Sequence, residues 1–539
     1  MARTPLLSRF QQLVADFQEA DRTGKSVVQV QDDRRNAGIS RRDFLKVGGA
    51  TLGAAVVAGH IPKFSGQTPR IAIVGGGIAG LNAALTLHDH GLASTVYESS
   101  GRVGGRMHSD TTSWLNGQTS EHCGELIDTG HTVILGLAQR FGLPTVDLHA
   151  AEVPGSNDTY FFDGSYFATN QANKDFNPVY RALVADNNAA PFPTLYNSFT
   201  QAGFDLDHMS LSDWIDSRVP GGHGSTLGQL LDVAYNIEYG NVTTEQSSLN
   251  LVYLLFNTTQ FQIFGASDER FHIKGGNERL PRAIAAALPP GSVKLNNRLT
   301  GIVKNSDGTF TLKVQTSSGS EDQVFDHVIM TIPFSVLRTI LPSDAAYRAA
   351  GFNALKQTAI TQLGYGKNAK LHLQFDTRFW RQTNQAWGKS TGTSFADTGY
   401  QNSWDVTRAQ DGATGILVDY TGGGVPLASF TGDADDPAVV AQFAQTFLDQ
   451  INDVYPGIAS HWNGRATLDV PLRNPNLLGS YSYWKVGQYT LFSGFEGVRQ
   501  GNCHFAGEHC SINFQGFMEG GAQEGQRAAN EVLGDLKKA

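Results

Sequence analysis

The sequence is poor in cysteine, carries no excess of positive charge and contains no long apolar run. Its 539 residues include three cysteines, Cys123, Cys503 and Cys510. Three are too few for a disulfide framework and their spacing is not that of a zinc site, so we interpret them as thiols, with a Cys503–Cys510 pair as the alternative. The formal net charge of −9 argues against a nucleic-acid partner, which would need a basic surface. No run reaches the roughly 18 apolar residues of a membrane-spanning helix, so we expect no membrane span.

The first 65 residues differ in composition from the rest of the chain. Ser40–Lys46 reads SRRDFLK, and a short apolar stretch rich in glycine and alanine follows at Val47–Gly59. A charged head before an apolar segment of this length is typical of a signal region, and the arginine pair resembles the twin-arginine export signal. We therefore predict an exported protein, periplasmic or secreted; the alternative is a basic helix start followed by a core helix.

A β–α–β pattern begins directly after this extension. Arg70–Val74 is a short, β-branched apolar run of the kind that forms a buried parallel strand. Ile78–Leu87 has the pattern of a helix, and Thr95–Glu98 has that of a second strand. The unit predicts an α/β fold with a Rossmann-like nucleotide-binding domain.

The remaining pattern divides the chain into segments. Residues 175–259 show helix-like periodicity, which predicts a helical insertion, and strands near residues 370–420 predict a second, mixed sheet. The other predicted elements are helices His131–Phe141 and Gly520–Leu536 and strands Ser292–Val303, Thr309–Gln315, Val324–Ile332, Lys370–Phe375, Gly415–Tyr420 and His504–Gly507. The predicted domains are an N-terminal extension (1–65), a nucleotide-binding domain in three parts (66–130, 271–340 and 479–539), a helical insertion with a substrate region (131–270) and a substrate-binding domain (341–478).

A glycine-rich turn joins the first strand to the first helix. Gly75-x-Gly77-x-x-Gly80 allows a tight turn, a close backbone approach to a pyrophosphate and close packing of helix on strand. We expect the cofactor to meet this loop, Ala79 included. Glu98 lies 18 residues beyond Gly80, at the end of the second strand, where a carboxylate accepts hydrogen bonds from ribose hydroxyls.

Two further segments distinguish FAD from a nicotinamide cofactor. Arg102, Gly105 and Arg106 belong to a second glycine loop straight after Glu98, which suits a chain crossing a diphosphate, since arginine binds phosphate oxygens in a bidentate fashion. Near the C-terminus, a strand ends at Gly507–Glu508, and Phe517–Met518 precedes the last predicted helix. The N-terminus of that helix would stabilise an anionic reduced flavin ring. Together the three segments predict FAD.

The chain resembles the flavin-containing amine oxidases, which include monoamine, polyamine and L-amino-acid oxidases. The similar segments span most of the chain from Arg70 to Leu533; they are IVGGGIAGL (73–81), ESSGRVGGR (98–106), GGNERLP (275–281), VIMTIPFSVL (328–337), KLHLQFDTRFW (370–380) and FAGEHCSINFQGFMEGG (505–521). The resemblance implies a two-domain oxidoreductase with a helical insertion. It also implies amine oxidation by flavin, with O2 as the usual acceptor.

The resemblance implies roles for single residues. Lys370 matches the family lysine that holds a water near flavin N5, and Val303 matches the position whose backbone meets the adenine. Covalent members have a cysteine in a Gly-Cys-Tyr triplet, where this chain has Gly479–Ser480–Tyr481. We therefore expect non-covalent FAD. Tyr481 and Phe517 match the two aromatic positions on the substrate side of the flavin, where aromatic walls exclude water and favour a neutral amine.

The substrate is predicted from a smaller set of residues. Tyr420 ends a strand that resembles the one whose tyrosine holds the substrate carboxylate in L-amino-acid oxidases. The arginine that binds this carboxylate in that branch is replaced by a segment containing Glu125. Glu125 could face an ammonium or guanidinium group or cap the following helix. The missing arginine leaves open another arginine, such as Arg270, or a basic substrate.

The predicted activity is therefore FAD-dependent oxidative deamination of L-amino acids by O2, giving a 2-oxo acid, ammonia and H2O2. A primary-amine or polyamine oxidase is the alternative, which Glu125 favours, and a non-catalytic flavoprotein is a further alternative. No Ser/His/Asp arrangement points to a nucleophilic mechanism. The predicted partners are a small amino acid or amine and O2, with no nucleic acid or metal, and a homodimer or higher homo-oligomer is possible.

Overall fold

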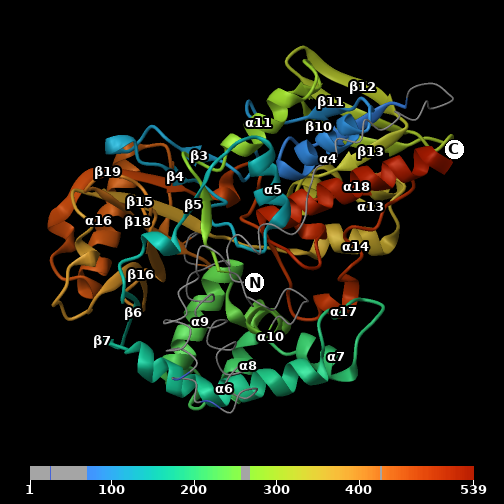
Figure 1. Ribbon diagram of the computed structural model, residues 1–539. Helices are drawn as coiled ribbons and strands as arrows, with labels where there is room; N and C mark the ends of the chain where they lie inside the picture. The colour runs from blue at the N-terminus through green and yellow to red at the C-terminus, as the bar shows by residue number, and fades with distance from the viewer. Residues whose placement is uncertain (1–24, 26–28, 30–68, 257–267, 425–427, 539) are drawn as a thin grey trace.

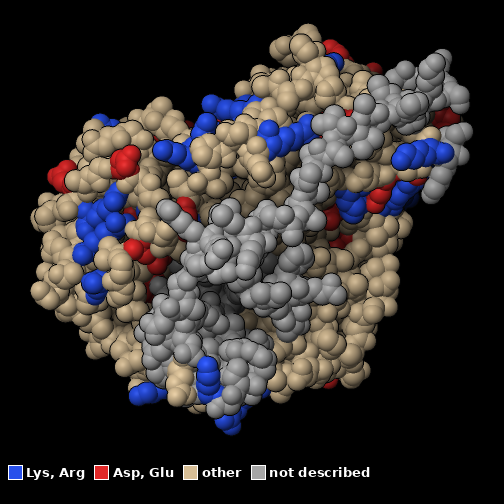
Figure 2. All heavy atoms as spheres, viewed as in Figure 1, with Lys and Arg blue, Asp and Glu red and all other residues tan. Residues whose placement is uncertain are grey.

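The computed structural model describes residues 25, 29, 69–256, 268–424 and 428–538. The export motif at residues 40–46 lies outside them. Among the described helices, none has the length and apolarity that crossing a membrane requires. On the face drawn in Figure 2, the described lysines and arginines form small separate groups with acidic residues among them. Cys123, Cys503 and Cys510 are free thiols, so the alternative of a Cys503–Cys510 disulfide is wrong.

A five-stranded parallel sheet forms the first part of the fold. Its strands run in the order β21 (Cys503–Phe505), β13 (His327–Met330), β1 (Ile71–Val74), β2 (Thr95–Tyr97) and β9 (Val293–Lys294). Every residue of β1 is buried, as a central parallel strand requires. Helices α4 (Ile78–Asp89) and α18 (Met518–Lys538) pack side by side along this part of the molecule (Figure 1). The predicted α/β fold is confirmed.

A seven-stranded mixed sheet forms the second part, at the left of Figure 1. Its order is β19 (Trp462–Asp469), β15 (Ala369–Phe375), β18 (Gly415–Thr421), β17 (Asn402–Asp405), β16 (Ser390–Ala396), β6 (Asn157–Phe162) and β7 (Ser165–Tyr166). The β16–β6 pair is parallel and the other pairs are antiparallel. Helix α16 (Pro437–Val454) packs against β19 and β15. Because β6 and β7 belong to this sheet, the segment 131–270 is not wholly helical.

Helices form the third part, at the bottom of Figure 1. They are α6 (Thr169–Ala189), α7 (Gln201–Asp207), α8 (Leu211–Arg218), α9 (Thr226–Tyr239) and α10 (Leu249–Leu255). Three of them begin at a Thr or Ser whose side-chain oxygen accepts a backbone N–H of the first turn, at Thr200, Ser210 and Ser225. The predicted helical insertion is present, and its final residues, 257–259, lie outside the described ones.

Two predicted strands each divide in two. Ser292–Val303 breaks at Asn296, which has a positive φ of 58°, so β9 joins the parallel sheet while β10 (Arg298–Lys304) joins a separate three-stranded sheet with β11 (Phe310–Thr316) and β12 (Gly319–Phe325). Val324–Ile332 breaks at Asp326, whose carboxylate accepts the backbone N–H of Arg70 at 2.7 Å. The other elements are β3 (Ser109–Asp110), β4 (Ser120–Glu121), α5 (Thr132–Arg140), β5 (Thr145–Asp147), β8 (Phe271–Ile273), α11 (Arg279–Ala287), α12 (Phe334–Ile340), α13 (Asp344–Ala349), α14 (Ala354–Gln362), β14 (Gly364–Tyr365), β20 (Ser482–Tyr483) and α17 (Gln488–Phe492).

Candidate active site

A cavity lies between the two large sheets. On one side it is lined by residues that follow the carboxyl ends of β1, β2, β13 and β21, where nucleotides bind in open parallel sheets. On the other side it is lined by residues of β15, β17 and β18. The predicted site residues on its wall are Gly75, Gly77, Ala79, Glu98, Arg102, Gly105, Arg106, Glu125, Lys370, Tyr420, Tyr481, Gly507, Glu508, Phe517 and Met518.

The glycine loop has the geometry that a bound pyrophosphate needs. Gly75 has a φ of +111°, and a Cβ on Gly80 would lie 2.0 Å from the carbonyl oxygen of Gly75, so no larger side chain fits there. A Cβ on Gly77 would meet no atom nearer than 4.0 Å, because this residue faces the cavity at the N-terminus of α4. The first N–H groups of a helix have no partners within it, so they point to an anion. Gly80 packs helix against strand and does not line the cavity.

Glu98 is fixed at the end of β2 by hydrogen bonds. Its carboxylate accepts the backbone N–H groups of Gly76 at 2.7 Å and Ser100 at 2.8 Å. Asn476, which the sequence did not single out, lines the same end of the cavity and accepts a hydrogen bond from Arg298 at 2.5 Å. Val303 lies at the other end of β10, is 46% exposed and does not line the cavity. Its predicted contact with the adenine stays a prediction.

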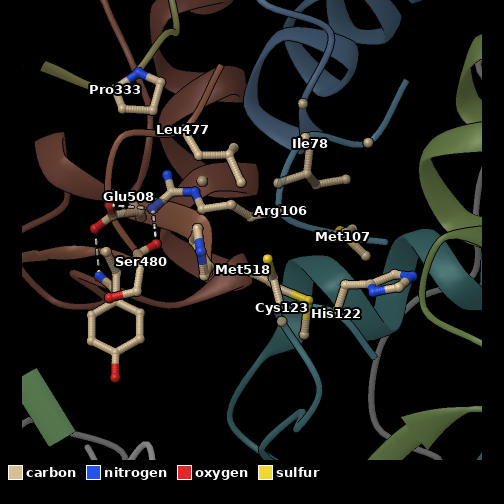
Figure 3. Close-up of a pocket in the computed structure, with 18 of the residues that line it drawn as sticks. Ile78, Arg106, Met107, His122, Cys123, Pro333, Leu477, Ser480, Glu508 and Met518 are labelled. Atoms are coloured by element: carbon tan, nitrogen blue, oxygen red, sulfur yellow. Dashed lines mark hydrogen bonds and ion pairs between the residues drawn. The ribbon is translucent and has the colours of Figure 1, made fainter. Parts of the chain in front are cut away.

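Arg106 and Glu508 form a buried ion pair beside the cavity (Figure 3). The Nη1 of Arg106 lies 2.8 Å from Oε1 of Glu508 and donates to the carbonyl of Ser480 at 2.9 Å. Burial by itself would raise the pKa of Glu508, but Arg106 and further hydrogen-bond donors lower it to about 2. Arg102 instead donates to its own loop, at the carbonyls of Val103 and Gly105. Arg102 therefore shapes the second glycine loop, whereas Arg106 ties that loop to Glu508.

The chain fits FAD at this end of the cavity. Gly77 leaves room for a phosphate, Glu98 offers a carboxylate for ribose, and α18 begins at Met518 on the cavity wall. Ser480, at the position of the attachment cysteine in covalent members, donates its hydroxyl to Oδ1 of Asn368 at 2.6 Å. Its side chain is drawn beside the Arg106–Glu508 pair in Figure 3.

Lys370 is held by three acceptors on the substrate side. Its Nζ donates to the carbonyls of Glu121 at 3.1 Å and Cys123 at 3.0 Å and lies 2.8 Å from Oε2 of Glu125. An ammonium group has three N–H donors, so all of them are used. A water near flavin N5 would have to replace one of these acceptors, and the predicted water-holding role is not evident in this geometry.

Glu125 is the counter-ion of Lys370. Its other oxygen, Oε1, accepts the indole N–H of Trp404 at 2.9 Å. Burial by itself would raise the pKa of Glu125, but the charge of Lys370 and these two hydrogen bonds lower it. Both carboxylate oxygens are therefore occupied by protein groups. Glu125 therefore positions Lys370 and Trp404, and because it also lines the cavity, its contact with a substrate ammonium stays a prediction.

Strand register places three of these side chains on one face of the mixed sheet. Lys370 pairs directly with Tyr420, and Tyr420 pairs with Asn402 on its other side. Trp404 lies two residues beyond Asn402, and side chains two residues apart share a face of a strand. The register therefore places Lys370, Tyr420 and Trp404 on the same face, and all three line the cavity.

Aromatic side chains complete this wall. The hydroxyls of Tyr420 and Tyr481 lie 2.7 Å apart, and Tyr481 also donates to the carbonyl of Ile237 at 3.2 Å. Phe517 lines the cavity next to His131, whose ring lies 5.3 Å away edge-on. The two predicted aromatic positions thus lie in one cavity with Lys370, although they are far from it in sequence.

Glu269 is a further lining residue that sequence reasoning missed. It is 4% exposed, and among the described residues neither of its carboxylate oxygens has a hydrogen-bond partner. Burial raises its pKa well above the usual value, and the charges of Asp128 and Glu238 raise it further. No motif marks Glu269, because the backbone bridge between Ile127 and Phe271 brings it beside Asp128.

Arg270 does not supply the missing carboxylate partner. Its guanidinium binds Asp147 at 2.9 and 2.7 Å and does not line the cavity. The arginines that do line the cavity within the described residues, Arg102 and Arg106, lie at the cofactor end. Arg270 is therefore excluded as the residue that replaces the arginine of the L-amino-acid oxidases.

Comparisons with known proteins agree with this geometry. A family described as "Flavin containing amine oxidoreductase" matches residues 78–533. "Putative L-amino-acid oxidase YobN" of Bacillus subtilis (strain 168) is 25% identical, with 86% of this chain and 95% of that protein covered. Polyamine oxidase 2 of Arabidopsis thaliana is 26% identical, with 86% and 88% covered. In fold, the chain is similar to cyclohexylamine oxidase from Brevibacterium oxydans IH-35A, with a TM-score of 0.72, 20% identity and 87% and 100% covered. The chain belongs to the flavin-containing amine oxidoreductase family, whose members use FAD and O2 to oxidise small amine substrates.

Proposed function

We propose that this chain is an FAD-dependent oxidase of amines that carry a second positive charge. Basic L-amino acids are its first candidate substrates, and diamines or polyamines are the second. The proposal is carried by Glu269, a buried carboxyl on the cavity wall without a hydrogen-bond partner.

A cation is the group that Glu269 is suited to receive. Burial raises its pKa most, like-charge repulsion by Asp128, Glu238 and Glu125 raises it further, and Arg408 opposes this in part. These effects favour the neutral carboxyl of Glu269 over its carboxylate. An ammonium or guanidinium group beside it would favour ionisation and give the carboxylate a charge-assisted partner. Binding of a cationic group at this wall should thus release a proton.

The L-amino-acid form of the substrate rests on Tyr420 and Tyr481. Both residues line the cavity; Tyr481 donates to the carbonyl of Ile237, so Tyr420 donates to Tyr481 and would turn its hydroxyl to a substrate carboxylate on binding. Among the described lining residues, no lysine or arginine remains for this task, because Lys370 is bound to Glu125. The lack of a free lysine or arginine on the described wall favours a diamine as substrate, whereas the hydroxyls of Tyr420 and Tyr481 favour an amino acid. Relatives named as an L-amino-acid oxidase and a polyamine oxidase make both worth testing.

The residues of the chain hold the substrate and exclude water. When bound, FAD supplies the acceptor for a hydride equivalent from the carbon next to the amine nitrogen, and O2 then takes the electrons as H2O2. Trp404, Tyr420 and Tyr481 form an apolar wall with few free polar atoms, which favours the neutral amine that this step requires. Lys370, fixed by Glu125, lies on the same wall. The imine product leaves and hydrolyses in water to a carbonyl compound and ammonia.

We also propose that the FAD is bound non-covalently. Ser480 offers a hydroxyl at the position of the attachment cysteine, and the thiol on the described cavity wall, Cys123, stays protonated at neutral pH because burial raises its pKa to about 11. Acid precipitation of the protein should leave all the flavin in the supernatant. Flavin that stays with the precipitate would contradict the proposal.

Matched substrate pairs test the second charge. L-Arginine and L-citrulline have nearly the same shape but differ in charge, as do putrescine and 1-butylamine. Peroxide release and anaerobic flavin reduction would be measured for all four. We expect kcat/KM at least tenfold higher for the charged member of one pair. The pair whose charged member has the higher kcat/KM identifies the substrate class. Equal kcat/KM values within both pairs would contradict the role of the second charge.

Glu269→Gln tests the residue itself. The substitution keeps the shape but removes the ability to ionise, so the preference for the charged member should fall about tenfold while the neutral member is oxidised as before. Glu321→Gln, on the exposed strand β12, is the matched control and should change neither rate. An unchanged preference in Glu269→Gln would remove Glu269 from substrate recognition. No flavin reduction by any amine would favour a non-catalytic flavoprotein.

A further inference from the structure

Two buried histidines lie on strands β13 and β21 of the parallel sheet, away from the carboxyl ends of these strands that line the cavity. His327 begins β13 and His504 lies within β21. His504 pairs with Ile329, two residues after His327, so both imidazoles project from the same face of the sheet. His327 is 6% exposed and His504 is fully buried. Within the described part of the chain, the Nδ1 of His327 and the Nε2 of His504 have no hydrogen-bond partner, which is costly for buried polar atoms.

Glu531 of α18 orients one of these rings. Its Oε2 lies 2.7 Å from Nδ1 of His504. A carboxylate accepts hydrogen bonds, so Nδ1 carries a proton, and in the neutral imidazole Nε2 then has the free lone pair that a metal ligand needs. Histidines that bind metals commonly donate their other ring N–H to a carboxylate in this way. His504 is thus prepared to act as a ligand through Nε2.

Asp535 adds an anionic oxygen from the next turn of the same helix. Its Oδ2 lies 3.8 Å from Nε2 of His504. One ligand atom each from His327, His504 and Asp535 lies within 4.8 Å of the other two. In a tetrahedral zinc site the ligand atoms are about 3.4 Å apart, since each bond is about 2.1 Å long. Small side-chain rotations would bring the three atoms to that spacing.

We propose that His327, His504 and Asp535 bind a divalent cation of the zinc class, with water as the fourth ligand. Two imidazoles and one carboxylate suit zinc better than magnesium or calcium, which prefer oxygen ligands. The cation would fasten the C-terminal end of α18 to β13 and β21, about the full length of the helix away from the cofactor end at Met518. Its role is structural and is independent of the amine chemistry.

Arg499 competes for the same carboxylate. Its Nη1 lies 2.5 Å from Oδ2 of Asp535, and its Nε donates to the carbonyl of Gly501. A bound cation would have to share Asp535 with this guanidinium or displace it. Removal of Arg499 should therefore strengthen cation binding. If the two histidines only pack against each other and bind no cation, removal of Arg499 should produce no such effect.

The test uses untagged holoenzyme, treated with a chelator and dialysed, titrated with ZnCl2 in a calorimeter. We expect one Zn²⁺ per chain and a rise in Tm on binding, with no rise for Mg²⁺. Asp535→Asn should weaken binding at least tenfold, and Arg499→Gln should strengthen it. Asp449→Asn, at an exposed position of α16, is the matched control and should bind as the parent does.

Two outcomes would overturn the proposal. One is the absence of stoichiometric Zn²⁺ binding to the parent protein. The other is a Zn²⁺ affinity that stays the same in Asp535→Asn. His504→Gln is a second variant, but its buried position makes a folding defect a separate risk; Asp535 is partly exposed, so its variant decides the question.

Discussion

The two ends of the cavity are built in different ways. At the cofactor end, short sequence motifs supply glycine turns, a helix N-terminus and an acid at a strand end, and the Arg106–Glu508 pair joins two such motifs from distant parts of the chain. At the substrate end, Lys370, Glu125 and Trp404 come from three distant segments and form one hydrogen-bonded unit. The cofactor end depends mainly on backbone geometry, which few substitutions preserve. The substrate end depends on hydrogen bonds and ion pairs between side chains, so a substitution of one residue changes the environment of its partners.

The largest effect is expected from Gly80→Ala. The added Cβ would lie 2.0 Å from the carbonyl oxygen of Gly75, so the glycine loop and α4 could not keep their present packing. We expect loss of nearly all bound FAD, measured as the ratio of flavin to protein absorbance. Gly130→Ala, where a Cβ would meet nothing within 4 Å, should keep its flavin. Normal flavin content in Gly80→Ala would show that the cofactor end does not depend on this packing.

Lys370→Met should have the next largest effect. It leaves the carboxylate of Glu125 buried without its cation, which costs about 3–5 kcal/mol of unfolding free energy. The double variant Lys370→Met/Glu125→Gln removes the stranded charge and should recover part of that stability. Urea unfolding of both variants measures the coupling, and flavin reduction measures the chemistry. If the double variant is no more stable than Lys370→Met, the two residues are not a coupled pair.

Acid should weaken the cofactor end through Glu508. The pKa of Glu508 is lowered from 4.5 to about 2 in the folded chain. A carboxyl with a lowered folded pKa stabilises the fold above pH 4.5, and that contribution, about 3 kcal/mol, is lost as the pH falls toward 2. Glu508→Gln should be less stable at neutral pH and should show a shallower fall in acid. Parallel acid profiles for the two proteins would contradict the assignment.

The smallest effect is expected from Trp404→Phe. The ring is retained, but the indole N–H that donates to Glu125 is lost, which costs about 1 kcal/mol because Lys370 still neutralises the carboxylate. We expect kcat/KM to fall by less than tenfold, with normal FAD content. If Trp404→Phe lowered kcat/KM as much as Lys370→Met does, Trp404 would contact the substrate directly.

The cofactor end was largely predictable because its signals are local. Gly75, Gly77 and Glu98 lie on one β–α–β unit, and the resemblance to the amine oxidases located Glu508 at the far end of the chain. Val303 does not line the cavity, because β10 is separated from the parallel sheet at Asn296 and joins a different sheet.

The substrate end was predictable only in part. Lys370, Tyr420, Tyr481 and Phe517 were located by resemblance, and all line the cavity. The partner of Lys370 was not predicted, because Glu125 is 245 residues away and only the packed sheets bring them together. Trp404 and Glu269 lie in segments without any motif. Their places follow from strand register and from a backbone bridge, which a sequence alone does not specify.

The sequence by itself determined the cofactor class, the α/β framework and the family, because glycine turns, strand periodicity and an acid at a strand end are local patterns that can be recognised within short segments of the chain. Only the tertiary structure decided what each charged group does. Packing made Glu125 the counter-ion of Lys370, bound Arg270 to Asp147 and left the carboxylate of Glu269 buried with no hydrogen-bond partner among the described residues. Burial and distance set the charge of these groups, and both exist only once the distant segments have folded together.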